Sequence, residues 1–192
     1  MNISKAKKNN RYVAFLRGIN IGGNVLIKMD ELRGLFESLG YKNVKTILAS
    51  GNVVFNAAPQ KTATLSCNIG LKLKQTFERD IIVFVYPLEV LQELEKSQPF
   101  HGLDVTPEIY LLVTFLPEEP GKGDLSVLSQ DKDFTIIKIY EKMICGVLTR
   151  RPGKATPELM ITLEKIFGKS ITNRTWGTIL KILKVADQDK NT

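Results

Sequence analysis

Histidine and cysteine are scarce in this chain. Its 192 residues include one histidine, His101, and two cysteines, Cys67 and Cys145. The familiar Cys/His zinc frameworks need paired ligands at short spacing, and this sequence has no such pairs. We therefore expect neither a metal site nor a bound cofactor. The two cysteines fall in a helix-like and a strand-like segment, and we interpret both as small buried apolar residues.

The signatures of several enzyme classes are also missing. The sequence contains neither GxxxxGK[ST] nor GxGxxG, the two glycine patterns that cradle nucleotide phosphates. Ser50 lies in ASGN and not in a G-x-S-x-G nucleophile elbow. His101 follows Pro99 in a Pro/Gly-rich stretch, which favours a surface histidine over a general base. No residue pair indicates a particular reaction, so whether the protein is an enzyme is left open.

Long apolar runs are absent as well. No stretch approaches the roughly 20 apolar residues that a membrane-spanning helix needs. Residues 1–10 contain three lysines and no acid, and no apolar signal core follows them. We expect a disordered basic tail over residues 1–10 and a cytoplasmic protein with no membrane partner.

The positive charge is unevenly distributed. The chain has a formal net charge of +7, with ten basic and three acidic residues between positions 138 and 184. Residues 11–137 hold 13 basic and 15 acidic residues. A basic C-terminal third permits binding to a polyanion such as nucleic acid, but it is only an electrostatic footprint.

Periodicity predicts an α+β fold in which one pattern occurs twice. In the helix expected near residues 62–78, Leu65, Ile69, Leu73 and Phe77 recur every four residues, which is typical of one buried face. The first β-α-β-β-α-β order comprises strands near 11–17, 44–49, 52–57 and 81–86, and helices near 29–39 and 62–78.

A linking helix after Pro87 and a Pro/Gly-containing stretch at 98–108 separate this half from the second. We expect two tandem ferredoxin-like subdomains (α-β plaits), over residues 11–97 and 98–192, plus a C-terminal helix. The second half is predicted to contain strands near 109–116, 134–140, 143–149 and 170–172, and helices near 124–129, 157–167 and 174–185.

Three polar stretches are candidates for a binding site. The first follows the first strand and contains Arg17, Gly18, Asn20, Gly22 and Gly23. Glycines allow positive φ, successive N–H groups in such turns can hold an anion, and arginine can form a bidentate contact with phosphate or carboxylate. The alternative is a turn that simply needs flexible backbone geometry, and turn chemistry is the commoner use of glycine.

The other two stretches are Ser50-Gly51-Asn52 and the segment from Thr172 to Trp176. The former also fits a tight hairpin turn, in which Gly and Asn tolerate left-handed conformations. The latter is expected to open the last helix, with Thr172 or Asn173 as the cap and Arg174 beside an anion-binding N-terminus. Trp176 would either stack on a ligand or pack in the core.

The chain resembles a bacterial family known as domain of unknown function 1697. The resemblance is carried by YVAFLRGINIGG at 12–23, MDELR at 29–33, SGNVVF at 50–55, Pro99-Phe100 and ITNRTW at 171–176. It implies two plait-like subdomains and no established activity. At four positions the chain lacks the polar residue that is usual in the family. These positions are Val25, Leu26, Ala49 and Thr175.

These observations lead to one main hypothesis of function. We expect a binding module for a small anionic ligand, phosphate- or nucleotide-like, in a cleft between the two subdomains. Arg17 and Arg174 would bind its charge, the glycine-rich loop and Ser50 with Asn52 would surround it, and Trp176 would stack. The alternatives are sequence-independent nucleic-acid binding through the basic C-terminal third and a protein–protein adaptor. The sequence does not indicate the oligomeric state.

Overall fold

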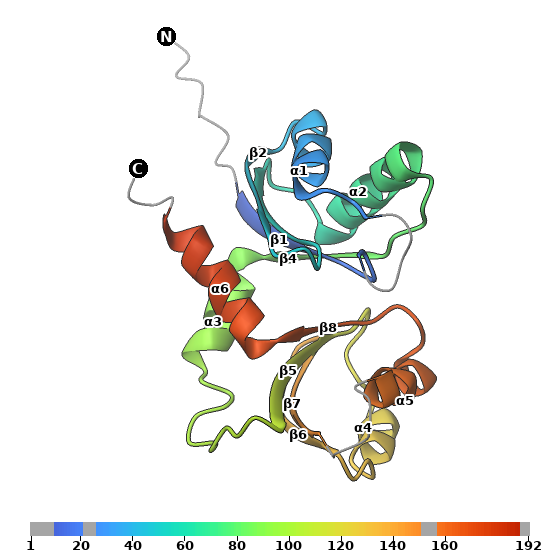
Figure 1. Cartoon of the computed structure of the whole chain (residues 1–192), viewed down its shortest axis with the longest axis vertical. Helices are drawn as coiled ribbons and strands as arrows, with labels where there is room; N and C mark the ends of the chain where they lie inside the picture. The colour runs from blue at the N-terminus through green and yellow to red at the C-terminus, as the bar shows by residue number, and fades with distance from the viewer. Residues whose placement is uncertain (1–9, 21–25, 151–156, 189–192) are drawn as a thin grey trace. The chain divides into compact units, whose positions relative to one another are not determined.

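The computed structural model describes residues 10–20, 26–150 and 157–188, which form two compact units. Unit 1 comprises residues 1–91 and 185–192, and unit 2 comprises residues 92–184. The positions of the two units relative to one another are not determined, so each is described by itself (Figure 1). The predicted basic tail at 1–10 lies almost entirely outside the described residues.

Unit 1 is a four-stranded antiparallel sheet covered on one face by two helices (Figure 1). The strand order is β2-β3-β1-β4, as expected for an α-β plait. Side chains alternate along β1, so Tyr12, Ala14 and Leu16 enter the core formed with the helices. The elements are β1 (Asn10–Leu16), α1 (Met29–Ser38), β2 (Lys42–Ile47), β3 (Asn52–Ala57), α2 (Thr62–Phe77) and β4 (Val83–Pro87), followed by α3 (Leu88–Lys96).

Unit 2 repeats the same topology. Its strand order is β6-β7-β5-β8, and α4 and α5 cover one face of the sheet (Figure 1). Leu112 of β5 and Leu116, the residue after it, pack with Leu159 and Leu163 of α5 in a second core. The elements are β5 (Ile109–Phe115), α4 (Lys122–Leu128), β6 (Phe134–Tyr140), β7 (Met143–Thr149), α5 (Pro157–Phe167), β8 (Thr172–Thr175) and α6 (Trp176–Asp187).

The predicted fold class is therefore confirmed, including the two plait-like subdomains and the C-terminal helix. The helical periodicity of residues 62–78 is confirmed too, because Leu65, Ile69 and Leu73 are fully buried. The predicted domain boundary at residues 98–108 stays a prediction.

Two local expectations were wrong. The strand expected near 170–172 extends over Thr172–Thr175 and pairs antiparallel with 112–115 of β5, so these residues do not open the last helix as expected. This short segment has no apolar alternation to fix its bounds, and pairing with the edge of β5 decides them. Cys67 is exposed on α2, whereas Cys145 is buried in β7 as expected.

Gly146 in β7 lies directly under the ring of Phe134 from the neighbouring strand. A Cβ at this position would overlap the ring atoms Cζ, Cε2 and Cε1 of Phe134, which is itself buried. The ring has no room to retreat, because it belongs to the core of unit 2.

We expect Gly146→Ala to lower the free energy of unfolding by about 1–3 kcal/mol, the usual cost of overpacking. Gly123→Ala is the control, because a Cβ on Gly123 in α4 meets no atom within 4 Å. Denaturant titration of both variants measures the difference. Phe134→Leu introduced into the Gly146→Ala protein should restore part of the loss, and equal stability of the two alanine variants would contradict this packing.

The two thiols should differ in reactivity. Burial raises the pKa of the Cys145 thiol to about 12, so the reactive thiolate is scarce at neutral pH, and the surrounding core also blocks access. Cys67 is exposed. Iodoacetamide should therefore add one group to the native protein, at Cys67, and two after denaturation, as read by mass spectrometry. Alkylation of both thiols at similar rates in the native protein would contradict the buried position of Cys145.

Candidate functional site

The first candidate stretch forms a turn at the end of β1. The N–H of Arg17 donates to the carbonyl of Ile82 at 2.9 Å, which extends the sheet by one residue. The chain then turns with left-handed backbone at Gly18 (φ 66°) and Asn20 (φ 60°). These are residue types that adopt this conformation at low cost, so the sequence determines the turn locally.

The side chain of Asn20 joins this turn to two other segments. Its Nδ2 donates to the carbonyl of Ile27 and to the carbonyl of Ala49, both at 3.0 Å. Its Oδ1 accepts from the N–H of Ile27 at 2.8 Å. All three bonds go to backbone, so Asn20 has a structural role and presents few atoms to a ligand.

The second candidate stretch forms the turn between β2 and β3. Asn52 is fully buried, and its Nδ2 donates to the carbonyl of Ile47 at 2.8 Å and to Oγ of Ser50 at 3.1 Å. The carbonyl of Gly51 accepts from the N–H of Leu16 at 2.8 Å. The sequence hypothesis of a tight hairpin turn is borne out, with Asn52 as its internal support.

Close packing seats this turn against the end of β1. Gly51 has a φ of 76°, and a Cβ there would lie 2.6 Å from Cδ1 of Ile19 and 2.9 Å from Cβ of Leu16. Glycine is required at this position both for its conformation and for the approach of Ile19. The two turns therefore stand side by side in unit 1.

The structure thus brings together five of the predicted site residues: Arg17, Gly18, Asn20, Ser50 and Asn52. Gly18 and Ser50 are exposed, Arg17 and Asn20 are half-buried, and Asn52 is buried. Gly22 and Gly23 lie outside the described residues, as does Val25. Leu26, one of the departures from the family pattern, is 67% exposed, and so contributes an apolar surface beside this end of the unit.

Arg174 stands in unit 2, in strand β8. Its guanidinium Nη1 donates to Oγ1 of Thr172 at 2.8 Å and to the carbonyl of Asn173 at 2.7 Å. Only 8% of the residue is exposed, and this burial lowers the pKa of Arg174 to about 10, which leaves it charged at neutral pH. Arg174 pairs with Val113, so it lies on the sheet face opposite α4 and α5.

The expected position of Arg174 at a helix N-terminus was wrong. Helix α6 begins at Trp176, and the N–H of Thr178 donates to Oγ1 of Thr175 at 3.3 Å. Thr175 is therefore the capping residue, in place of Thr172 or Asn173, which belong to the strand. The anion-binding argument based on the helix end does not apply to Arg174.

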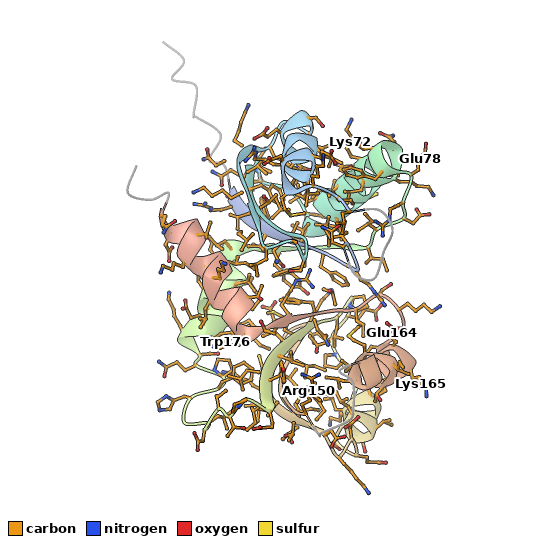
Figure 2. The ribbon with its side chains drawn as sticks, viewed as in Figure 1. Lys72, Glu78, Arg150, Glu164, Lys165 and Trp176 are labelled. Carbon is orange, nitrogen blue, oxygen red and sulfur yellow. The ribbon has the colours of Figure 1, made fainter. Side chains whose placement is uncertain are left out.

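Trp176 lines a hollow of about 310 Å³ at the surface of unit 2. It stands at the start of α6 (Figure 2), with its ring centroid 5.3 Å from that of Phe100 and an interplanar angle of 65°. Trp176 is half-buried, so its rings take part in both the fold and the surface. The other residues that line the hollow are Glu95, Gln98, His101, Leu111 and Leu180.

Sequence reasoning missed this hollow. The motifs containing Phe100 and Trp176 were both recognised, but nothing in either one indicates that they meet. Three polar residues, Glu95, Gln98 and His101, come from the end of α3 and the turn after it, and are all exposed. Their spacing of three along the chain, on either side of Pro99-Phe100, is the only signal that could have drawn attention to them.

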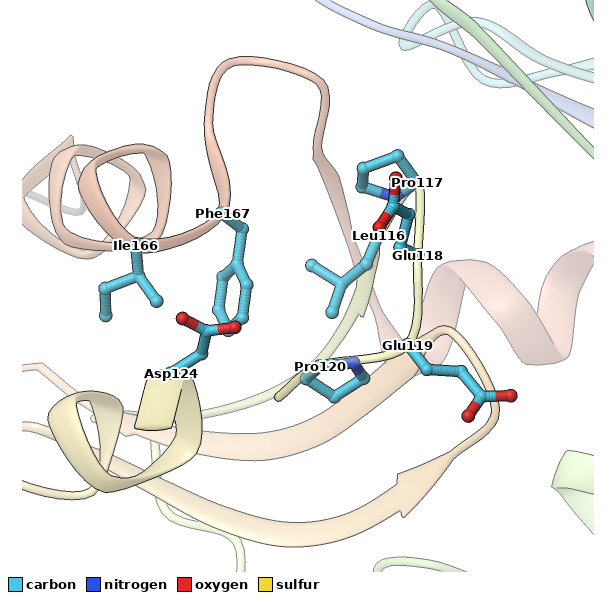
Figure 3. Close-up of a pocket in the computed structure, with 8 residues that line it drawn as sticks. All are labelled: Leu116, Pro117, Glu118, Glu119, Pro120, Asp124, Ile166 and Phe167. Atoms are coloured by element: carbon cyan, nitrogen blue, oxygen red, sulfur yellow. The ribbon is translucent and has the colours of Figure 1, made fainter. Parts of the chain in front are cut away.

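A second hollow in unit 2, of about 290 Å³, has the opposite character to an anion site. Leu116, Ile166 and Phe167 form its apolar wall, and Glu118, Glu119 and Asp124 supply carboxylates (Figure 3). Asp124 accepts from the N–H of Gly121 at 3.2 Å and so caps α4. Glu118 and Glu119 are both exposed.

Metal ligands do not gather in the described part of the chain. Among residues 10–20, 26–150 and 157–188, no group of three or more His, Cys, Asp or Glu side chains is placed to hold a metal ion. Within the same ranges, no helix has both the length and the apolar character needed to cross a membrane.

The fold defines the class of protein: two α-β plait subdomains in tandem, followed by a C-terminal helix. Within this class, the chain belongs to the family described as "Protein of unknown function (DUF1697)", whose sequence model matches residues 10–144. The resemblance seen in the motifs is thereby confirmed. The family has no assigned activity.

A solved structure is similar over nearly the whole chain. It is that of a conserved bacterial protein from Streptococcus pneumoniae, with a TM-score of 0.66 and 21% identity, covering 92% of this chain and 98% of the other. At this identity the likeness shows the fold alone. Comparison with curated proteins found no match.

We expect Asn20→Ala to lower the free energy of unfolding by about 2–4 kcal/mol, because it removes three side-chain hydrogen bonds and strains a left-handed position. Asn43→Ala is a matched control. Asn43 also has positive φ (50°) but is exposed, and its side chain bonds to no described residue. Its replacement should lower the free energy of unfolding only by the backbone strain of alanine at positive φ, about 1–2 kcal/mol. Equal losses in denaturant titration would mean that the Asn20 amide contributes nothing.

Proposed function

We propose that this protein binds a small anionic molecule, phosphate- or nucleotide-like, at the end of β1 in unit 1. The contacts would come from Arg17, the backbone of the turn at Gly18, and the hydroxyl of Ser50. The observation that carries the proposal is the hydrogen bond from Asn20 Nδ2 to the carbonyl of Ala49 at 3.0 Å. It holds the two turns side by side, so that Arg17 and Ser50, which are distant in the sequence, belong to neighbouring turns.

The chemistry of these groups suits an anion. A guanidinium presents several N–H donors in a planar fork that matches phosphate or carboxylate oxygens. The half-buried position of Arg17 reduces its screening by water, which strengthens a charge-assisted hydrogen bond. Gly18 carries no side chain, so a ligand can approach the backbone of the turn closely.

Rigidity is the second support. Asn20 and Asn52 are occupied by backbone carbonyls, which fixes the shape of both turns before any ligand arrives. A preformed site avoids the entropy cost of ordering loops on binding. The same bonds explain why polar residues in both motifs are needed even if only Arg17 and Ser50 touch the ligand.

Arg174 and Trp176 were expected to complete this site across the two subdomains, and that expectation stays a prediction. The nucleic-acid alternative, based on the basic C-terminal third, also stays a prediction. It differs in one measurable respect, because backbone binding to nucleic acid weakens steeply with added salt.

The test is isothermal titration calorimetry with inorganic phosphate, AMP, ATP, citrate and short DNA and RNA oligonucleotides at two salt concentrations. Arg17→Gln should weaken binding of the best anion about 10-fold to 100-fold, the loss typical of one hydrogen bond to a charged group. Ser50→Ala should weaken it by less than about 10-fold, since a neutral hydrogen bond contributes less.

Arg33→Gln is the matched control. Arg33 lies on α1 of the same unit, is exposed, and forms an ion pair with Asp30 at 3.0 Å. The Arg33→Gln variant should bind every anion with the affinity of the parent protein. Affinity that is unchanged in Arg17→Gln, or equally reduced in both variants, would overturn the proposal. Binding only to DNA or RNA, lost at the higher salt, would support the alternative instead.

A further inference from the structure

The hollow around Trp176 differs in composition from the polar turns of unit 1. Its volume of about 310 Å³ is that of a small ligand site. It contains the only tryptophan and the only histidine of the chain. Because all its residues belong to unit 2, it is defined without reference to unit 1.

Aromatic and aliphatic side chains form most of its lining. Phe100 and Trp176 meet in an edge-to-face arrangement with centroids 5.3 Å apart, which holds the indole at a fixed angle. Phe100 is buried and anchors the pair, whereas Trp176 remains half-buried. Leu111 of β5 lies in the wall, and Leu180 of α6 leaves 38% of its surface exposed at the rim.

One acidic side chain lies at the rim of the hollow. Among the residues that line it, Glu95 supplies the one carboxyl group, and Gln98 adds an amide. A carboxylate accepts hydrogen bonds and attracts positive charge, and an indole face also attracts cations. An anion would meet the repulsion of Glu95, so this hollow is unsuited to the ligand proposed for unit 1.

We propose that this hollow is a second binding site, which takes an aromatic ring carrying a cationic or N–H-donating group. The ring packs against Trp176, Leu111 and Leu180, and its donor group bonds to the carboxylate of Glu95. Gln98 and His101 bind further polar atoms of the ligand. The site is separate from the anion site and does not depend on it.

The single tryptophan makes the proposal directly measurable. Excitation at a wavelength that selects tryptophan reports on Trp176 alone, since the chain has one tryptophan. The probes are benzamidine and benzoate, which share a ring and a planar head group but carry opposite charge. Guanosine serves as a neutral ring with N–H donors, and ribose as a polar molecule without a ring.

Benzamidine and guanosine should change the fluorescence of Trp176 in a saturable way, and ribose should not. Benzoate should bind at least about tenfold more weakly than benzamidine, because its carboxylate faces that of Glu95. Glu95→Gln should remove most of the preference for benzamidine over benzoate, because it should lower the affinity for benzamidine about tenfold. Phe100→Leu should weaken the binding of both benzamidine and guanosine, since it releases the indole of Trp176 from its fixed angle.

Glu89→Gln is the matched control. Glu89 is an exposed glutamate on the same helix α3 and does not line the hollow. This variant should bind benzamidine as the parent does, and circular dichroism of all variants confirms that they are folded. Arg17→Gln should also leave benzamidine binding unchanged, so failure of one site is distinguishable from failure of the other.

Three results would overturn the proposal. One is the absence of a saturable fluorescence change with either benzamidine or guanosine at millimolar concentration. Another is benzoate binding as tightly as benzamidine. The third is an equal loss of benzamidine affinity in Glu95→Gln and Glu89→Gln, which would assign the effect to net charge and not to this hollow.

Discussion

The amide of Asn20 is the contact on which the polar end of unit 1 depends. Left-handed backbone at Gly18 and Asn20 takes this segment out of the sheet, so its neighbours cannot complete their hydrogen bonds in a ladder. The amide supplies those bonds: it donates to the carbonyls of Ile27 and Ala49 and accepts from the N–H of Ile27. A residue that tolerates positive φ and also carries both a donor and an acceptor is needed here, and asparagine meets both conditions.

The approach of Ile19 to Gly51 complements that amide from the apolar side. The turn between β2 and β3 is held by a polar bond on one side and by van der Waals contact on the other. The position of Arg17 and Ser50 is a consequence of this arrangement. In the anion site proposed for unit 1, residues that need not touch the ligand hold those that would bind it.

The two units share a topology but differ in the chemistry they present. Unit 1 offers a guanidinium and a hydroxyl beside glycine-containing turns, whereas unit 2 offers an aromatic hollow with a glutamate and a second hollow rimmed by carboxylates. The strand order is the same in both sheets, so topology does not decide what each unit binds. The difference comes from the segments that flank the strands.

The sequence by itself determined the features that rest on neighbouring residues. Helical periodicity predicted α2 within one residue of its end, and the glycine and asparagine positions predicted both turns of unit 1, because these patterns depend on local geometry. Tertiary structure alone decided the features that depend on distant partners. A strand near 170–172 was expected, but the bounds of β8 at Thr172–Thr175 come from its pairing with β5, and Phe100 reaches Trp176 only because α3, β5 and α6 are folded together. Periodicity shows which face of a segment is buried but not which distant segment it meets, so the aromatic hollow could be found only in the folded chain.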